Sequence, residues 1–252
     1  MPGNGRLRVL LLGGTGEGRQ IAARLAHSAD IDVVTSLAGR VRDPRWPRGE
    51  VRVGGFGGAD GLRQWLPENG IDAVLDATHP FAARISANAF DAARRAAIPY
   101  AMYRRPPWVE EPGDRWIRVQ NLEQAADLLP QYGTRAFLTI GRQGVSAFGG
   151  VPGVRLLIRA IDPPPDPLPA GCELLLARGP FAVDDEIALM RDRRIEVLVT
   201  KDSGGDQTYA KIEAARRLAL PVLVLARPPV PAGAPVVNAV DDAVHWLERI
   251  RG

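Results

Sequence analysis

The feature that most constrains the fold of this chain is a regular alternation of short apolar runs with amphipathic helical patterns along nearly its whole length. The run 8–12, for example, is followed by the segment 17–27, in which apolar side chains recur at helical spacing. Parallel strands require crossover connections, which are usually helices, so this alternation is typical of parallel sheets. The sequence therefore predicts an α/β protein with helices on both faces of mainly parallel sheets.

The alternation is interrupted once, at residues 104–116, where three prolines and a glycine stand among mixed charges. We interpret this segment as a linker and expect two Rossmann-like domains with a ligand cleft between them. The first, residues 1–105, is predicted to bind a dinucleotide, and the second, residues 106–252, to bind substrate and close over the cofactor. The predicted strands are 8–12, 31–36, 50–53, 71–76, 99–103, 136–140, 154–159, 173–177, 196–200 and 222–226. The predicted helices are 17–27, 59–66, 81–97, 122–129, 184–191, 209–218 and 241–249.

The charged residues narrow the choice of partners. The formal net charge is +3, and 30 of the 32 basic residues are arginine. This bias has two interpretations. One is genomic base composition, and the other is a need for guanidinium groups that bind carboxylates or phosphates. The arginines are scattered among acidic residues, without a basic tail or interleaved aromatic platform, so nucleic-acid binding is not expected.

Two further compositional features indicate the compartment. The apolar run at residues 9–12 is too short for a signal peptide, and no stretch of about 18 apolar residues is present to span a membrane. Cys172 is the single cysteine, which fits a reducing compartment, and no Cys/His cluster suggests a metal. We therefore expect a cytoplasmic protein without metal or membrane partners; its oligomeric state is left open, a monomer included.

The loop after the first predicted strand is glycine-rich and opens a helix. Glycines allow the backbone to approach a phosphate, and the helix amino terminus behind them presents free N–H groups. The loop departs from the G-x-G-x-x-G pattern of dinucleotide sites, and a plain tight turn is the alternative. We predict that it binds the phosphates of a nucleotide through Gly13, Gly14, Thr15, Gly16 and Glu17.

The second strand ends without the acidic residue that NAD sites usually place there for the ribose hydroxyls. Ser36 and Arg40 offer a hydroxyl and a guanidinium instead, which favours NADPH over NADH. The alternative is that Arg40 is an ordinary solvated arginine. The predicted contacts of this segment are Ser36, Leu37, Ala38, Gly39 and Arg40.

A third candidate loop follows the strand 71–76. His79 stands at this strand end, unlike the two other histidines of the chain, and either lines the site or has a structural role. The predicted cofactor contacts of this loop are Thr78, His79, Pro80 and Phe81.

The second predicted domain also has polar loops at strand ends. Gly141 and Arg142 follow one strand and could offer an amide and a guanidinium to an anion. Lys201, one of only two lysines, follows another, which suggests a need for a compact ammonium group rather than an exposed turn. The other candidate site residues of this loop are Asp202, Ser203 and Gly204.

Together these loops resemble the precorrin-6A reductase family of cobalamin biosynthesis, and the resemblance covers almost the whole chain. The motifs that carry it are GGTGEGR at 13–19, SLAGR at 36–40, DATHPFA at 76–82, TIGRQ at 139–143, RGPF at 178–181 and TKDSGG at 200–205. The P-loop and serine-hydrolase motifs are missing, and Tyr209 and Lys211 are two residues apart, not at the Tyr-x-x-x-Lys spacing of short-chain dehydrogenases.

The resemblance implies hydride transfer from NADPH to a double bond of an anionic tetrapyrrole, precorrin-6A, giving precorrin-6B. It further implies that 13–17 hold the pyrophosphate, 36–40 the adenosine phosphate and 78–81 the region towards the nicotinamide. The loop 201–204 would face cofactor and substrate, with Lys201 as proton donor and Asp202 as its orienting partner. The alternatives are the cobalt-containing substrate of the anaerobic route, another anionic metabolite reduced by NAD(P)H, or a nucleotide sensor without activity.

Overall fold

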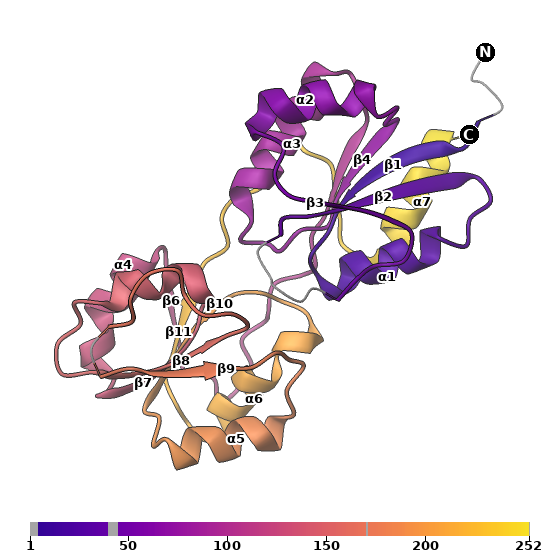
Figure 1. Cartoon of the computed structure of the whole chain (residues 1–252). Coiled ribbons are helices and arrows are strands. Elements are labelled where there is room, and N and C mark those ends of the chain that lie inside the picture. Colours follow the sequence, from indigo (N-terminus) through magenta and orange to yellow (C-terminus); the bar gives the residue numbers. More distant parts are fainter. Residues whose placement is uncertain (1–4, 40–44, 170, 252) are drawn as a thin grey trace. The chain divides into compact units, whose positions relative to one another are not determined.

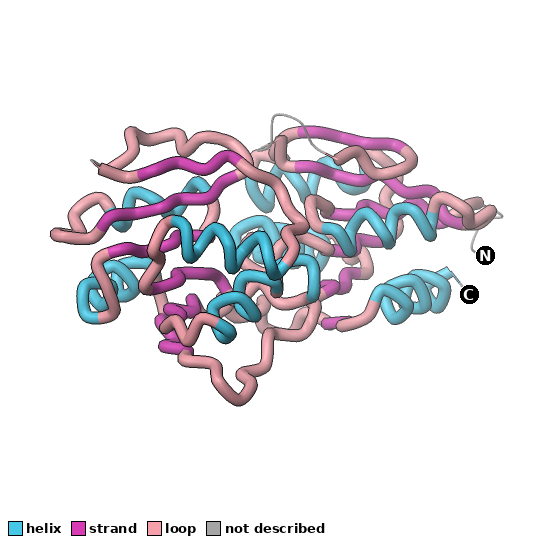
Figure 2. Tube along the Cα trace, turned by 90° about the horizontal axis from the view of Figure 1, so that it is seen from below, coloured by secondary structure: helices cyan, strands magenta, loops and turns pink. Residues whose placement is uncertain are grey.

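The chain forms two compact units in a computed structural model, which describes residues 5–39, 45–169 and 171–251. Unit 1 comprises Met1–Pro106 and Pro228–Gly252, and unit 2 comprises Pro107–Arg227. Each unit contains one parallel sheet with helices beside it (Figures 1 and 2). The predicted fold class, two α/β domains with parallel sheets, is confirmed.

The sheet of unit 1 has the strand order β12-β5-β4-β1-β2-β3 with all pairs parallel. This is the 3-2-1-4-5-6 order of dinucleotide-binding folds, with β12 as the sixth strand. Its strands are β1 (Leu7–Leu12), β2 (Ile31–Leu37), β3 (Glu50–Val53), β4 (Ala73–Asp76), β5 (Tyr100–Tyr103) and β12 (Val236–Val237). Its helices are α1 (Gly16–Leu25), α2 (Gly58–Glu68), α3 (Ala83–Arg95) and α7 (Val240–Arg251).

Alternate residues of β1 enter two different cores, one on each face of the unit 1 sheet. Val9 and Leu11 pack in the core that contains residues of α1 and α7. Leu10 and Leu12 pack in the core that contains residues of α2 and α3. Because both faces are covered, β1 reads in the sequence as a continuous apolar run rather than as an alternating pattern.

The sheet of unit 2 has the order β6-β11-β10-β7-β8-β9 and is also parallel throughout. Helices α5 and α6 share a core with β7, β8, β10 and β11, while α4 packs against β6 and β11. The strands are β6 (Trp116–Val119), β7 (Arg135–Thr139), β8 (Arg155–Ala160), β9 (Glu173–Leu176), β10 (Val197–Lys201) and β11 (Val222–Leu225). The helices are α4 (Leu122–Leu128), α5 (Val183–Asp192) and α6 (Ala210–Arg217), with 3-10 turns η1 (Leu129–Gln131), η2 (Arg142–Phe148) and η3 (Asp206–Thr208).

The division of the chain differs from the prediction at its carboxyl end. Residues 228–252 were assigned to the second domain but belong to unit 1. The reason is twofold: β12 pairs with β5, with Val236 opposite Met102, and α7 buries Ala243 and Leu247 in the core shared with α1. The predicted linker 104–116 is also mostly part of unit 2, where Trp108 is buried and Trp116 begins β6.

Among residues 5–39, 45–169 and 171–251, no helix combines the length and apolar character needed to cross a membrane.

Candidate functional site

The carboxyl ends of β1 and β4 are neighbours in unit 1, and each is followed by one of the predicted loops. Leu12 at the end of β1 is the register partner of Asp76 at the end of β4. The strand order reverses between these two strands, and in open parallel sheets a ligand crevice forms at such a reversal. The structure therefore brings the loops 13–18 and 77–81 together at the position where this fold binds ligands.

The glycines of the first loop are required by its geometry. A Cβ at Gly13 would lie 2.9 Å from Cγ2 of Thr35, so a larger side chain would push against β2. Gly14 has φ of +113°, and a Cβ there would meet no atom within 4 Å. The backbone at Gly14 is thus open to approach, and the first turn of α1 presents its N–H groups directly behind it. This arrangement fits a phosphate group.

Thr15 joins the first loop to the loop after β4. It is the N-cap of α1, and its buried hydroxyl accepts a hydrogen bond from the N–H of Gly18 at 2.9 Å. The same hydroxyl donates to the carbonyl of Ala77 at 2.8 Å. One side chain therefore fixes both the start of α1 and its distance from the end of β4.

Replacing Thr15 with valine is expected to destabilise the protein by about 1–2 kcal/mol, because the helix loses its cap and the Ala77 carbonyl loses its donor. The matched variant Thr15→Ser keeps the hydroxyl and is expected to lose much less. Urea unfolding of the three proteins measures the difference. Equal midpoints for the valine and serine variants would show that the hydroxyl does not hold the two loops.

The carboxylate of Glu17 has a partner within unit 1. Both of its oxygens accept from Nη1 of Arg105, at 3.0 and 2.8 Å, and both side chains are nearly buried. Glu17 was predicted to contact the cofactor. With its carboxylate engaged by Arg105, any contribution to a phosphate would come from its backbone N–H group.

The end of β2 carries the predicted adenosine-phosphate segment. Ser36 is buried at the strand end, Leu37 is buried beside it, and Ala38 and Gly39 are exposed. Arg40 lies outside the described residues. The Ser36 hydroxyl accepts a hydrogen bond from Arg52 of β3 at 3.2 Å. No local pattern in the sequence indicates Arg52, because only the strand register brings it to this position.

A buried carboxylate fixes the loop after β4. Oδ1 of Asp76 accepts from the N–H and the hydroxyl of Thr78, at 3.0 and 2.7 Å, and Oδ2 accepts from the Tyr100 hydroxyl at 3.0 Å. Burial and the Asp76 charge raise the pKa of Tyr100, so its hydroxyl remains a donor. The hydroxyl of Thr78 is thus oriented by Asp76 rather than used to cap α3, which begins at Ala83.

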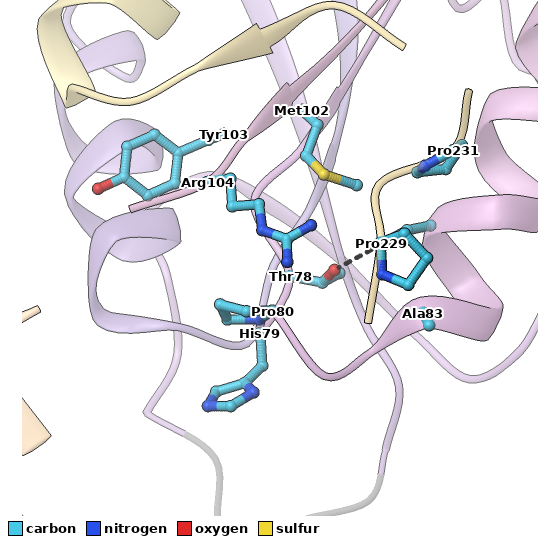
Figure 3. Close-up of a pocket in the computed structure, with 10 residues that line it drawn as sticks. Thr78, His79, Pro80, Ala83, Met102, Tyr103, Arg104, Pro229 and Pro231 are labelled. Carbon is cyan, nitrogen blue, oxygen red and sulfur yellow. Dashed lines mark hydrogen bonds between the residues drawn. The ribbon is translucent and has the colours of Figure 1, made fainter. Parts of the chain in front are cut away.

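A small pocket lies beside this loop within unit 1 (Figure 3). His79 and Pro80 line it, and Nδ1 of His79 accepts from the N–H of Phe81 at 3.2 Å, which leaves the proton of the neutral ring on Nε2. The His79 ring points away from the other labelled side chains. The other lining residues are Thr78, Ala83, Ser86, Met102, Tyr103, Arg104, Pro229 and Pro231.

Unit 2 has a strand-order reversal of its own, between β7 and β10. Thr139 at the end of β7 is the register partner of Thr200 near the end of β10. Gly141 follows β7 with φ of +80° and open space around it, and Arg142 begins η2. The two loops predicted from the second half of the sequence, 139–143 and 200–205, therefore lie together at the reversal in this sheet.

Lys201 is the last residue of β10 and is partly buried. Burial lowers the pKa of its ammonium group, because the charged form loses solvation. Ser203 and Gly204, which follow, are buried, and Gly204 has φ of +65°. A lysine with a lowered pKa at a strand end is a stronger acid than an exposed lysine and is a candidate proton donor.

The contacts of Asp202 favour a structural contribution. Its buried carboxylate accepts from the Trp108 N–H at 3.2 Å and lies 3.6 Å from Nε of Arg227 and 3.9 Å from Nη1 of Arg118. Nε of Arg227 also donates to the Asp202 carbonyl. Asp202 thus anchors the two segments where the chain enters and leaves unit 2, and its orientation of Lys201 stays a prediction.

Comparison with known proteins places these loops in context. The family model described as precorrin-6x reductase CbiJ/CobK matches residues 8–248. A precorrin-6A reductase of Rhodococcus erythropolis is 57% identical over 240 residues, covering 95% of this chain and 97% of the relative. A cobalt-precorrin-6A reductase of Priestia megaterium is 30% identical over 252 residues, covering 95% and 97%.

A solved structure agrees with the sequence comparisons. The structure described as CobK precorrin-6A reductase superposes with a TM-score of 0.91 at 40% identity and covers 96% of each chain. The similarity therefore extends over both units and includes all the loops described above.

Proposed function

Because the chain belongs to the precorrin-6x reductase CbiJ/CobK family, we propose that it reduces a ring double bond of precorrin-6A to give precorrin-6B, with NADPH as hydride donor. The observation that carries the proposal is the glycine loop at the strand-order reversal of unit 1, within a chain that matches the family from residue 8 to residue 248. The higher identity to a precorrin-6A reductase, 57% against 30%, favours the cobalt-free substrate.

The residues of unit 1 fit a phosphorylated dinucleotide. The open backbone at Gly14 and the amino terminus of α1 suit the pyrophosphate, and the loop 13–17 is proposed to hold it. The segment 36–40 contains no carboxylate to repel a 2′-phosphate, which supports NADPH rather than NADH. The loop 78–81, held by Asp76, is proposed to contact the nicotinamide end.

The reduction adds a hydride to one carbon of the double bond and a proton to the other. When bound, NADPH supplies the hydride and leaves as NADP⁺. We assign the proton to the Lys201 ammonium group, whose lowered pKa makes it a better acid than an exposed lysine. Gly141 and Arg142, at the neighbouring strand end, are proposed to bind cofactor phosphate, and Ser203 and Gly204 to support the same contact. The scattered arginines would attract the substrate carboxylates.

An NADPH oxidation assay tests this function. We expect the purified protein to consume one NADPH for each precorrin-6A, measured by the loss of NADPH absorbance and by the mass of the product. Consumption only with cobalt-precorrin-6A would assign the anaerobic route, and consumption only with another acceptor would assign another reductase. Binding of NADPH without oxidation by any of these acceptors would indicate a nucleotide sensor.

A further inference from the structure

Arg52 lies beside the strand end where dinucleotide-binding folds recognise the adenosine ribose. It is the register partner of Ser36 in the parallel pair β2–β3, so the two side chains project from the same face of the sheet. Nη1 of Arg52 donates to the Ser36 hydroxyl at 3.2 Å. The fold thus places a guanidinium next to the residue that the sequence had already indicated for a 2′-phosphate.

The guanidinium is held in one orientation by its surroundings. Nη1 donates to the Gly54 carbonyl and Nη2 to the Gly55 carbonyl, both at 2.8 Å. The plane lies over the Phe56 ring, 3.7 Å from its centroid. These contacts use the edge formed by the two terminal nitrogens. The other edge, Nε–H and the second N–H of Nη2, has no acceptor among the described residues and has the spacing that binds phosphate in a bidentate manner.

The charge of Arg52 is not balanced by a described carboxylate. Among the residues that the structure describes, no acidic side chain forms a salt bridge with it. Burial lowers the pKa of its guanidinium, the direction expected for a cation that loses solvation without gaining a counter-ion. The group still remains charged at neutral pH. A fixed cation of this kind favours a bound anion.

The loop that follows β3 leaves room for that anion. Gly54, Gly57 and Gly58 have φ between +77° and +116°, and a Cβ at any of them would meet no atom within 4 Å. The N-cap residue of α2 is Gly57. Because glycine has no side chain, the N-cap residue provides no acceptor for the first N–H groups of this helix. The loop whose carbonyls hold the Arg52 guanidinium therefore has an open backbone.

We propose that Arg52 binds the 2′-phosphate of NADPH and is the residue that selects NADPH over NADH. The proposal rests on the proposed function, because it assumes that unit 1 binds a nicotinamide dinucleotide. Ser36 supports the phosphate through its hydroxyl and through its hydrogen bond to Arg52. The glycines of the loop that accepts the Arg52 hydrogen bonds carry no side chains that would obstruct an approaching phosphate.

The test measures binding of NADPH and NADH to the full chain by nucleotide fluorescence, without substrate. For Arg52→Gln we expect the dissociation constant for NADPH to rise about 10- to 100-fold, the effect of losing hydrogen bonds to a charged group, while that for NADH changes little. Arg52→Lys keeps the charge but loses the two-pronged geometry and should give an intermediate ratio. The control, Arg63→Gln on exposed α2 surface, should match the unaltered protein.

Three outcomes would overturn the proposal. If binding of NADPH and of NADH were weakened equally in both Arg52 variants, Arg52 would only pack the loop 54–56. Unchanged dissociation constants for both nucleotides in both variants would exclude contact with the 2′-phosphate and leave Arg40 to be tested by Arg40→Gln. Equal affinity of the unaltered protein for the two nucleotides would remove the selectivity itself. A failure of the proposed function is separate, because it appears as absence of NADPH oxidation with precorrin-6A in the unaltered protein.

Discussion

Replacing Lys201 with methionine is expected to lower the turnover of precorrin-6A about 100-fold or more, the usual range for loss of a positioned acid. Methionine keeps much of the length of the lysine side chain but cannot donate a proton. Steady-state NADPH oxidation measures the change. A variant with undiminished turnover would assign the proton to solvent or to the nitrogens of the macrocycle.

The pH dependence gives a second measurement of the same proposal. The acid form of Lys201 is lost as pH rises through its pKa, which burial lowers below the ordinary value. For the unaltered protein kcat/KM should therefore fall at a lower pH than an exposed lysine would give, and the Lys201→Met variant should lack this fall. Lys211→Met is the control: its ammonium donates to the Thr208 carbonyl, so this change should cost stability and leave the pH profile in place.

In the Lys201→Met variant, the free energy of unfolding is expected to stay equal or rise although turnover falls. The pKa of Lys201 is lower in the folded protein than in the unfolded chain, so between the two values the unfolded chain binds more protons. In that window the free energy of unfolding rises with pH, and below it the buried ammonium group lowers stability. The variant should be at least as stable as the unaltered protein at neutral pH and should lack this rise. A less stable variant would show that the Lys201 side chain stabilises the fold.

The fold could be predicted from the sequence because its helices and strands have strong local patterns. Parallel strands buried on both faces appear as apolar runs, and each is followed by an amphipathic helix or a polar loop. The two strands that were missed lack such a signal. In β6, only Val119 is buried, and β12 has two residues in a segment of prolines and alanines. Their places are fixed by pairing with β11 and β5, which are distant in sequence.

The candidate site was predictable where it depends on the residues directly after a strand. The loops after β1, β4, β7 and β10 lie at the two strand-order reversals because carboxyl ends of parallel strands share one edge. Contacts set by register or by long-range packing were not predictable. Arg52 is one of 30 arginines until the β2–β3 register places it beside Ser36. The carboxylate of Asp202 contacts Trp108 and Arg227, which no local pattern connects.

A buried ion pair in unit 2 leads to the second large expected effect. Arg159 of β8 donates to both carboxylate oxygens of Glu186 in α5, at 3.0 and 2.6 Å, and both side chains are buried. The guanidinium also stacks on Phe181, 3.8 Å from the ring centroid. Phe181 belongs to the motif RGPF, so the pair connects this loop, the sheet and α5.

Replacing Arg159 with methionine is expected to destabilise unit 2 by about 3–5 kcal/mol, because the Glu186 carboxylate stays buried without its partner. The double variant Arg159→Met with Glu186→Leu should recover much of this loss, since two apolar side chains replace two desolvated charges. The control Arg193→Met breaks the exposed pair with Glu173 and should cost less than about 1 kcal/mol. Guanidinium unfolding followed by tryptophan fluorescence measures all three. If the double variant were as unstable as the single one, the lost free energy would reside in the stacking of Arg159 on Phe181 rather than in the unpaired charge.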